Sequence, residues 1–291
     1  MIPNLLCFND MLPDVEGQVA DVGYLQGYDD AVDKVNVIKC LQRGHMGAVY
    51  KVKDARCGET FALKRTSKKQ LKTPHQIDNA RHEVDIMRRL QFHPNIVTIV
   101  SAWQTQTHMY IKMECCRCDL WRFIQCDAFT TKHARLFLGQ LAKALQFMHV
   151  SGIVHRDVKP ENILISHNTG LKLGDFGLAC TLDYLHGRGR YSRVGTLPFM
   201  SPEMKKKHAY GTPIDVWAMG VIFFEMLTKR PPFDFKHIGK PYRHNNTVQD
   251  IPQFSSMHMD KHDRHLVLKM LTLQPKQRIT ASGVSMYLSV L

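Results

Sequence analysis

The chain has 291 residues, of which 44% are hydrophobic and 22% are charged. This composition excludes wholesale disorder, and the length fits one large domain or two smaller ones. The formal net charge of +13 favours polyanionic partners such as ATP, phosphorylated segments, acidic peptides or nucleic acid, without choosing among them.

The eight cysteines are scattered, and the first twelve residues lack the basic start of a signal peptide. We therefore expect free thiols in a reducing intracellular compartment. Cys115, Cys116 and Cys118 form the densest group, but no second pair of cysteines or histidines at suitable spacing completes a zinc site. The longest apolar stretch, residues 216–227, is too short for a membrane span and contains Glu225, so we expect a soluble protein.

Residues 1–34 are rich in Asp, Gly and Asn, and we expect an N-terminal extension that packs loosely or not at all. From Val35 onward, short β-branched or aromatic runs alternate with glycines, which predicts an antiparallel sheet. Apolar residues at three- and four-residue steps then predict a helix over residues 75–90. Two more strands are predicted over residues 96–103 and 109–113.

After Cys118 the pattern is mostly helical. Helices are predicted over residues 134–149 and 213–228, and a late one begins in residues 266–273. The fold class is therefore α+β. A small antiparallel sheet lobe with one helix is expected over about 35–113, a junction or hinge over 114–118, and a larger, mainly helical lobe over 119–291. Ligands commonly bind at such junctions.

Two signals precede the junction. The first is Gly44 and Gly47 in a strand–turn–strand setting, where backbone amides can approach phosphate oxygens, although such glycines often only form a turn. The second is Lys64, which ends an apolar strand, with Glu83 on the predicted helix. An ion pair would hold the ammonium for phosphate oxygens, whereas a solvated Lys and Glu is the alternative.

Two further signals follow it. The loop from His155 to Asn162 holds a carboxylate, an ammonium and a carboxamide, on Asp157, Lys159 and Asn162. These groups are suited to accept a hydroxyl proton, neutralise a phosphoryl oxygen and ligate a metal ion, respectively. Asp175, in Asp-Phe-Gly, adds a hard oxygen ligand suited to Mg²⁺, or is simply a turn residue.

In order and spacing, these four motifs resemble the eukaryotic protein kinases from about Val35 to Leu291. The resemblance implies the two-lobed protein kinase fold, with ATP and Mg²⁺ as cofactors. It assigns Asp157 as catalytic base beside Lys159, and Asn162 and Asp175 as metal ligands. The residues that it implies for ATP binding are Leu41, Gly44, Gly47, Val49, Ala62, Lys64, Glu83, Met113, Glu114, Cys116 and Leu164.

Two departures from the family pattern are Gln42, at the place of the first loop glycine, and Met46, at the place of the aromatic tip. Neither removes a charged group of the catalytic set, so we expect an active enzyme. The alternative is a pseudokinase scaffold that binds nucleotide or protein partners without chemistry. A nucleic-acid binder is disfavoured, because the basic runs at residues 68–72 and 205–207 lack interleaved aromatic residues.

Lys159 and Thr196 match the serine/threonine branch of the family, so the expected activity is transfer of the ATP γ-phosphoryl group to Ser or Thr hydroxyls of proteins. Glu203, in Ser-Pro-Glu, and Arg278 match the protein-directed branch, and argue against a small-molecule kinase. Arg156, directly before Asp157, resembles the arginine of kinases whose activation segment is ordered by phosphorylation. Ser192 and Thr181 are the hypothesised phosphorylation sites.

Residues 101–103 and 109–116 show a faint resemblance to kinases of the translation initiation factor 2 α subunit and to Wee-like kinases. The expected partners are ATP, a protein substrate and a regulatory protein of unknown kind, with no membrane. The expected location is the cytoplasm or nucleus, or that of a host cell if the chain is viral.

Overall fold

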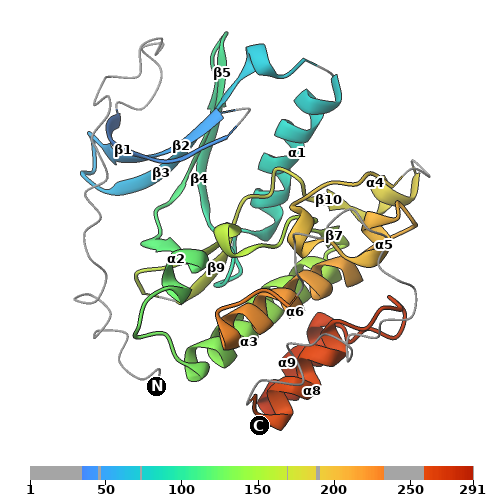
Figure 1. The fold of residues 1–291 in the computed structure, drawn as a ribbon. Helices are drawn as coiled ribbons and strands as arrows, with labels where there is room; N and C mark the ends of the chain where they lie inside the picture. The colour runs from blue at the N-terminus through green and yellow to red at the C-terminus, as the bar shows by residue number, and fades with distance from the viewer. Residues whose placement is uncertain are drawn as a thin grey trace. The chain divides into compact units, whose positions relative to one another are not determined.

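The computed structural model describes residues 35–44, 47–72, 74–168, 170–187, 191–232 and 259–290 (Figure 1). The extension expected over residues 1–34 and the loop tip expected at Met46 lie outside the described residues. The chain divides into two compact units: Met1–Phe92 with Val97–Arg117 and Ser166–Asn168, and His93–Ile96 with Cys118–Ile165 and Thr169–Leu291. No helix in the described part is both long and apolar enough to cross a membrane.

The first unit is built on one five-stranded antiparallel sheet in the order β1-β2-β3-β5-β4. Its strands are β1 (Val35–Arg43), β2 (Gly47–Asp54), β3 (Thr60–Ser67), β4 (Ile99–Gln104) and β5 (His108–Glu114). A short 3₁₀ turn, η2 (Lys68–Gln70), precedes the helix α1 (Pro74–Leu90), which packs against β4. The antiparallel sheet with one helix confirms the predicted character of this part of the chain.

The two faces of this sheet differ, because successive side chains of a strand point to opposite sides. One face carries a buried apolar cluster of Val35, Tyr50, Val52, Leu63 and Tyr110. The strand register places Val49 opposite Lys64 and Lys51 opposite Ala62, so these four residues share the other face. That second face therefore holds the nucleotide-binding candidates of β2 and β3.

The strand β4 begins at Ile99, later than the predicted start at residue 96. Asn95 and Ile96 belong to the second unit, where they pair with β9 (Leu171–Leu173). Leu173 N–H donates to the Asn95 carbonyl at 2.9 Å, and Ile96 forms a parallel bridge with Leu173. The prediction was wrong at this end because these β-prone residues pair with a strand more than 70 residues away in the sequence.

The second unit is mainly helical, with two small sheets in the orders β6-β8-β9 and β10-β7. Its helices are α2 (Leu120–Ile124), α3 (Thr131–Val150), α4 (Leu182–Gly187), α5 (Pro202–Lys205), α6 (Pro213–Thr228), α8 (Lys261–Met270) and α9 (Ala281–Ser289). Its other short elements are β6 (Cys118–Asp119), β7 (Ile153–Val154), η3 (Pro160–Asn162), β8 (Ile163–Ile165), β10 (Cys180–Thr181) and η4 (Leu197–Phe199).

The helix α6 forms the centre of this unit, and it has the predicted bounds. Twelve of its residues are buried, including Trp217, Phe223 and Phe224, so it is apolar nearly all round. The helix α3 packs against α6 and α9, and α6 also packs against α8, as Figure 1 shows. This helical framework carries the loops described below.

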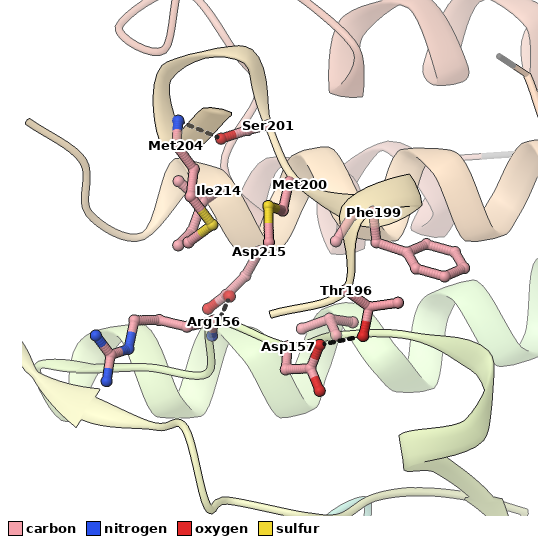
Figure 2. A pocket seen from close by; sticks show the side chains of 11 residues that line it. Arg156, Asp157, Thr196, Phe199, Met200, Ser201, Met204, Ile214 and Asp215 are labelled. Carbon is pink, nitrogen blue, oxygen red and sulfur yellow. Dashed lines mark hydrogen bonds between the residues drawn. The ribbon is translucent and has the colours of Figure 1, made fainter. Parts of the chain in front are cut away.

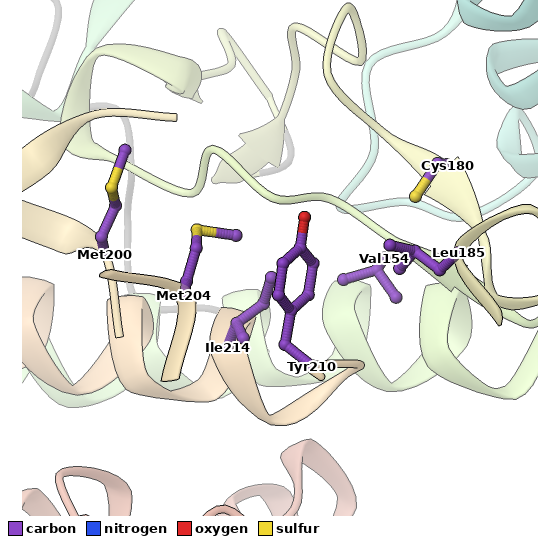
Figure 3. Close-up of a cluster of buried hydrophobic side chains, with 7 residues drawn as sticks. All are labelled: Val154, Cys180, Leu185, Met200, Met204, Tyr210 and Ile214. Carbon is purple, nitrogen blue, oxygen red and sulfur yellow. The ribbon is translucent and has the colours of Figure 1, made fainter. Parts of the chain in front are cut away.

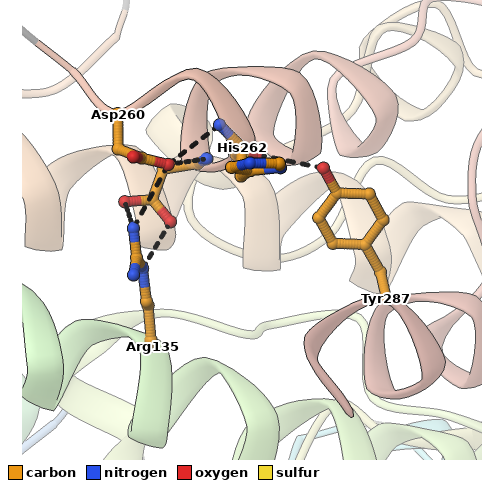
Figure 4. Close-up of polar contacts among 5 residues, drawn as sticks. Arg135, Asp260, His262 and Tyr287 are labelled. Carbon is orange, nitrogen blue, oxygen red and sulfur yellow. Dashed lines mark hydrogen bonds and ion pairs between the residues drawn. The ribbon is translucent and has the colours of Figure 1, made fainter. Parts of the chain in front are cut away.

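An ion-pair cluster joins α3 to the start of α8 (Figure 4). Arg135 donates to both carboxylate oxygens of Asp263 at 2.8 and 2.9 Å, and lies 3.2 Å from Asp260. Asp260 also caps α8, because its carboxylate accepts the N–H groups of His262 and Asp263. This cap explains why the late helix begins at Lys261, earlier than residue 266.

The first unit contains a buried ion pair that the sequence does not predict. Lys112 of β5 pairs with Asp54 at the end of β2, and the two residues are 4% and 5% exposed. The Lys112 ammonium also lies over the Phe61 ring, 4.2 Å from its centroid. Asp54 in addition accepts the backbone N–H groups of Arg56 and Cys57, so it orders the turn between β2 and β3.

Replacing Lys112 by Ala leaves the Asp54 carboxylate buried without its cation. We therefore expect the free energy of urea unfolding at pH 7 to fall by about 3 kcal/mol. The hydrogen bonds from Lys112 and Arg56 lower the pKa of Asp54 from 3.8 to about 2. The stabilisation is then complete above pH 4 and is lost as the pH falls toward 2, so the two proteins converge there. Lys53→Ala, an exposed change on β2, is the control, and equal losses in both variants would contradict this account.

Candidate active site

The first unit brings together Lys64 of β3 and Glu83 of α1, as the sequence predicts. The Lys64 ammonium lies 2.5 Å from a carboxylate oxygen of Glu83. The glutamate side chain is 7% exposed and the lysine side chain 22%, so the ammonium is fixed by its partner but still reaches solvent. Such a pair presents a positive point charge in a set position, which suits a phosphate oxygen.

Gly44, which precedes β2, and Gly47, which begins β2, have different roles. A Cβ atom at Gly47 would lie 2.0 Å from the Arg65 carbonyl oxygen, so the pairing of β2 with β3 requires a glycine there. A Cβ atom at Gly44 would meet nothing closer than 3.8 Å. Gly44 N–H donates to the Gly47 carbonyl at 2.8 Å, which closes the turn between β1 and β2. Leu41, the candidate before this turn, is exposed on β1.

The predicted hinge residues continue β5. Met113 pairs with Ala62 across β3 and β5, and Glu114 pairs with Phe61. The Glu114 carboxylate accepts the Thr98 N–H at 2.6 Å, so this side chain supports the loop before β4. Cys116 follows, half-buried, and its carbonyl accepts a weak hydrogen bond from the Cys115 thiol at 3.6 Å.

In the second unit, three side chains converge on the Asp157 carboxylate. Thr196 Oγ1 donates to its Oδ1 at 2.8 Å, Lys159 Nζ lies 3.0 Å from its Oδ2, and Asn162 Nδ2 donates to Oδ2 at 3.2 Å. Lys159 also donates to the Thr196 hydroxyl at 3.0 Å. The carboxylate is 9% exposed and fixed in direction, and its oxygens remain acceptors for a further hydroxyl donor.

The backbone before Asp157 is held by the buried carboxylate of Asp215 on α6. Asp215 accepts the N–H groups of His155 and Arg156 at 2.9 and 3.0 Å, and His149 of α3 lies 2.9 Å from the same carboxylate. Burial alone would raise the pKa of Asp215, but the hydrogen bond and charge of His149, with the His155 contacts, outweigh it and lower the pKa. The carboxylate therefore stays charged and keeps its backbone contacts.

Asp175 follows β9 in a left-handed conformation with φ of 55°. The residue before it, Gly174, bonds twice to the loop of residues 155–162, here called the catalytic loop after its place in the family motif. Its N–H donates to the Asn162 carbonyl at 2.8 Å, and its carbonyl lies 3.0 Å from His155 Nε2. The His155 ring also packs on the buried Phe176 ring at 5.3 Å. Asp175, whose side chain is exposed, thus directly follows a residue that is hydrogen-bonded to the Asn162 backbone.

A glycine allows the segment that contains Thr196 to lie close to the backbone before Asp157. Gly195 has φ of 92°, and a Cβ atom there would lie 2.4 Å from the Arg156 carbonyl oxygen. Only glycine permits this approach, which places Thr196 against Asp157. The far end of the segment is held by Glu203, whose carboxylate accepts two hydrogen bonds from Arg278 at 2.7 and 3.1 Å.

An apolar cluster supports the residues between β10 and α6 (Figure 3). Its buried members are Val154, Cys180, Leu185, Met200, Met204, Tyr210 and Ile214. Burial raises the pKa of the Cys180 thiol to about 11, so it remains neutral. Thr181 caps the start of α4 by accepting the Tyr184 N–H at 3.3 Å, whereas Ser192 is exposed and its carbonyl accepts the Tyr210 hydroxyl at 2.9 Å.

A pocket lies beside Asp157 within the second unit (Figure 2). Figure 2 shows Asp157 and Thr196 on one side of it, with Met200, Met204 and Ile214 around the rest. Ser201, where the family usually has Ala, is buried and accepts the Met204 N–H at 3.4 Å. The polar and apolar parts of residues 196–204 therefore meet at this pocket.

Sequence reasoning missed several supporting residues. His149 ends the helix predicted over residues 134–149, and no sequence pattern indicates that it contacts Asp215. The contact of the Tyr210 hydroxyl with the Ser192 carbonyl has no local sequence signal either. Leu164 of β8 is half-buried opposite Lys172 of β9, within the second unit. The candidates thus fall into two sets: Lys64, Glu83 and the glycines in the first unit, and Asp157, Lys159, Asn162, Asp175 and Thr196 in the second.

Residues 35–287 match the family model described as the protein kinase domain. The chain is 30% identical over 258 residues to serine/threonine-protein kinase PLK4 of Danio rerio, which covers 88% of this chain and 27% of that protein. It is 33% identical over 250 residues to calcium-dependent protein kinase 8 of Oryza sativa subsp. japonica, over 84% of this chain and 46% of that protein.

The chain is also 33% identical over 259 residues to an Aurora kinase of Saccharomyces cerevisiae, covering 88% of this chain and 69% of the relative. It thus spans less than half the length of the first two relatives and about two thirds of the third. The family match covers most of the chain and contains all of the motifs from Gly44 to Arg278. The chain belongs to the eukaryotic-type protein kinase family, in its serine/threonine branch.

Proposed function

We propose that this protein transfers the γ-phosphoryl group of ATP to serine or threonine hydroxyls of protein substrates, with Asp157 as the catalytic base. The observation that carries the proposal is the setting of the Asp157 carboxylate, fixed by Thr196, Lys159 and Asn162 within 3.2 Å. A general base must lie within hydrogen-bond reach of the proton that it accepts. The free lone pairs of the Asp157 carboxylate meet this requirement for the proton of a substrate hydroxyl.

Lys159 supplies the charge that this chemistry needs. Its ammonium lies 3.0 Å from both the Asp157 carboxylate and the Thr196 hydroxyl, so it is held beside the attacking oxygen of a bound substrate. Positive charge placed where negative charge develops lowers the barrier of phosphoryl transfer. The pattern of Lys159 with Thr196 supports hydroxyls of serine and threonine as acceptors.

The donor chemistry of Asn162 and Asp175 fits a magnesium ion. The Asn162 amide nitrogen donates to the Asp157 backbone carbonyl at 2.9 Å, which leaves the amide oxygen as a hard ligand. Asp175 offers an exposed carboxylate on a segment tied to Asn162. Bound Mg²⁺ would neutralise charge on the ATP phosphates, and one or two protein oxygens are enough to hold it there.

The first unit supplies groups suited to ATP. Lys64, held by Glu83, would meet the α- and β-phosphates, and the amides near Gly44 and Gly47 would approach the phosphates of the same nucleotide. For the adenine, the expected contacts are apolar side chains and the hinge backbone. In the first unit they comprise Leu41, Val49, Ala62, Met113, Glu114 and Cys116, and the family resemblance adds Leu164 of the second unit.

The pseudokinase alternative predicts the loss of a charged group from this set. Lys64, Asp157, Asn162 and Asp175 are all present, and Asp157 and Asn162 are held by hydrogen bonds within the same loop and to Thr196. The similarity to the initiation-factor and Wee-like kinases stays a prediction, as does the intracellular location. The regulatory partner of unknown kind likewise stays a prediction.

Incubation of the full chain with γ-labelled ATP, Mg²⁺ and a mixed protein substrate tests the proposed function. We expect labelled phosphoserine and phosphothreonine after acid hydrolysis, and no label when Mg²⁺ is chelated. Label on tyrosine alone, or no transfer under any divalent ion, would contradict it. Lys53→Met and Lys64→Met form a matched pair, of which only the second should abolish transfer, because only Lys64 is paired with Glu83.

Thr196 provides a sharper test of the geometry. Thr196→Val keeps the side-chain shape but removes the hydroxyl between Lys159 and Asp157, so we expect kcat to fall by about 10- to 100-fold with little change in the KM for ATP. Thr196→Ser keeps the hydroxyl and should retain most of the activity. Steady-state kinetics on one peptide substrate would measure both, and equal effects of the two changes would show that the hydroxyl is not required.

Ser192 is the better of the two hypothesised phosphorylation sites. Its side chain is exposed, and the Tyr210 hydroxyl that binds its carbonyl also interacts with Arg156. Thr181 instead caps α4 with its hydroxyl. A phosphate at Ser192 would add about −1.5 to −2 charges near the Arg156 guanidinium. Mass spectrometry of the active protein should therefore find phosphate on Ser192, and an unmodified segment in fully active protein would rule this out.

A further inference from the structure

Four basic side chains of the second unit have no acidic partner. They are here named the basic group and comprise Arg193, Lys205, Lys206 and Lys207. The stretch 191–208 contains one acidic residue, Glu203, and its carboxylate is buried and bound to Arg278. Within the residues that the structure describes, no ion pair or side-chain hydrogen bond involves a member of the basic group. The described part of the chain therefore leaves this positive charge uncompensated.

Packing holds the two segments of the basic group on one apolar cluster (Figure 3). The Ser192 carbonyl, directly before Arg193, accepts the Tyr210 hydroxyl at 2.9 Å. Tyr210 and Met204 are buried members of the same cluster, and Lys205 directly follows Met204. Burial, and then the charge of Arg193, lower the pKa of the half-buried Lys205, as expected of neighbouring cations. The charges of the two segments therefore act at one place.

The end of α5 carries a lysine where the backbone favours glycine. Lys207 has φ of 56°, in the left-handed region that glycine commonly occupies after a helix. Its N–H donates to the Met204 carbonyl at 3.1 Å, and the His208 N–H donates to the Glu203 carbonyl at 3.0 Å, so two hydrogen bonds fix this conformation. Cations do favour the end of a helix, but α5 has only four residues and a small dipole. A role for this lysine beyond its own helix is therefore favoured.

The basic group adjoins the pocket beside Asp157. Asp157 and Thr196 line one side of this pocket and Met204 lines another, as Figure 2 shows, and Lys205 directly follows Met204. A substrate whose hydroxyl meets Asp157 would pass this pocket on one side of its acceptor residue. An extended chain advances about 3.3–3.6 Å per residue, so the next few residues on that side would reach the basic group.

We propose that the basic group binds acidic side chains of the protein substrate, on one side of the residue that is phosphorylated. Opposite charge supplies the attraction and selects the partner. Exposed cations on a surface that packing holds in place need no rearrangement to receive Asp or Glu carboxylates. This inference rests on the proposed function, because it assigns a class of protein substrate to the same site.

Nucleic acid is the competing anion for the basic group. Single-stranded nucleic acid is bound by a basic groove with aromatic side chains on which bases stack. Tyr191 and Tyr210, the tyrosines of this stretch, instead pack against each other with ring centroids 5.2 Å apart, and Tyr210 is buried. An acidic peptide segment, which needs only a few cations close together, fits the basic group better.

Binding of peptides to the full chain, measured by fluorescence anisotropy, tests this proposal without requiring transfer. The peptides carry alanine at the acceptor position and three Asp residues on one side of it or on the other, and matched peptides carry Asn instead. The chain is first treated with phosphatase, so that no phosphate of its own occupies the basic group. Because exposed ion pairs are individually weak, we expect only one of the two Asp peptides to bind more tightly than its Asn counterpart, by about tenfold. The preference should vanish in 1 M salt, where the Debye length is about 3 Å.

A triple variant that combines Arg193→Gln, Lys206→Gln and Lys207→Gly should abolish the preference. Glycine suits the left-handed conformation at position 207, so we expect this variant to unfold at the same urea concentration as the unmodified chain. A matched control, which should keep the preference, removes the same charge from exposed positions of α8 in the same unit by combining Lys261→Gln, Arg264→Gln and Lys269→Gln.

Turnover of the same peptides, with serine at the acceptor position, separates this inference from the proposed function. We expect kcat/KM to be about tenfold higher for the favoured Asp peptide than for its Asn counterpart, and this ratio to fall to about one in the triple variant. Preferential binding without transfer to any peptide would contradict the proposed function alone.

Four results would overturn the inference, whether or not transfer occurs. The first is equal binding of Asp and Asn peptides, and the second is equal binding of the two Asp peptides. The third is a preference that survives in the triple variant. The fourth is an oligonucleotide that binds as tightly as the favoured peptide and is no longer bound by the triple variant, which would assign the basic group to nucleic acid.

Discussion

The catalytic loop depends on one buried carboxylate. Asp215 is 1% exposed and accepts two consecutive backbone N–H groups, those of His155 and Arg156, while His149 contacts it from α3. Arg156, whose N–H is the second of these donors, has φ of 68°, so the backbone turns sharply directly before Asp157. A buried charge is costly unless it is fully hydrogen-bonded. This requirement links the helical framework to the direction in which Asp157 points.

The rest of the second unit completes that arrangement. Gly195 can approach the Arg156 carbonyl only because it lacks a side chain, and this approach brings the Thr196 hydroxyl to Asp157. At the other end, Arg278 binds Glu203, donates to the Pro213 carbonyl at 2.8 Å and lies over the Trp217 ring. The segment of residues 195–203 is therefore held at one end by the catalytic loop and at the other by Arg278, which also contacts α6. Loss of either anchor would change the position of Thr196 without touching a reacting group.

The sequence predicts those parts of the structure that depend on residues close together in the chain. The apolar residues of 213–228 predict α6 with its observed bounds. The short β-branched or aromatic runs before residue 113, with glycines between them, predict the sheet. The charged residues of the candidate site could also be found, because Asp157, Lys159 and Asn162 stand within six positions of one loop. Lys64 and Glu83 required the family resemblance, since neither residue is unusual in its own segment.

The parts that escaped prediction depend on contacts between distant segments. Asn95 and Ile96 look like the start of β4 but pair with β9 instead. Lys112 stands in a strand where a lysine is normally solvent-exposed, and only the folded sheet shows that Asp54 and the Phe61 ring receive it. The need for glycine at position 195 is likewise a property of the Arg156 backbone, 39 residues earlier. Neither the periodicity nor the composition of a segment indicates which distant segment it will contact.

The central claim is that Asp157 accepts the proton of the substrate hydroxyl. Single-turnover phosphoryl transfer by Asp157→Asn, compared with the unmodified chain and with Asp127→Asn at an exposed site, tests it most directly. The account predicts a rate about 10²- to 10⁴-fold lower for Asp157→Asn, with ATP binding retained and Asp127→Asn unaffected. Transfer by Asp157→Asn at the rate of the unmodified chain would contradict it.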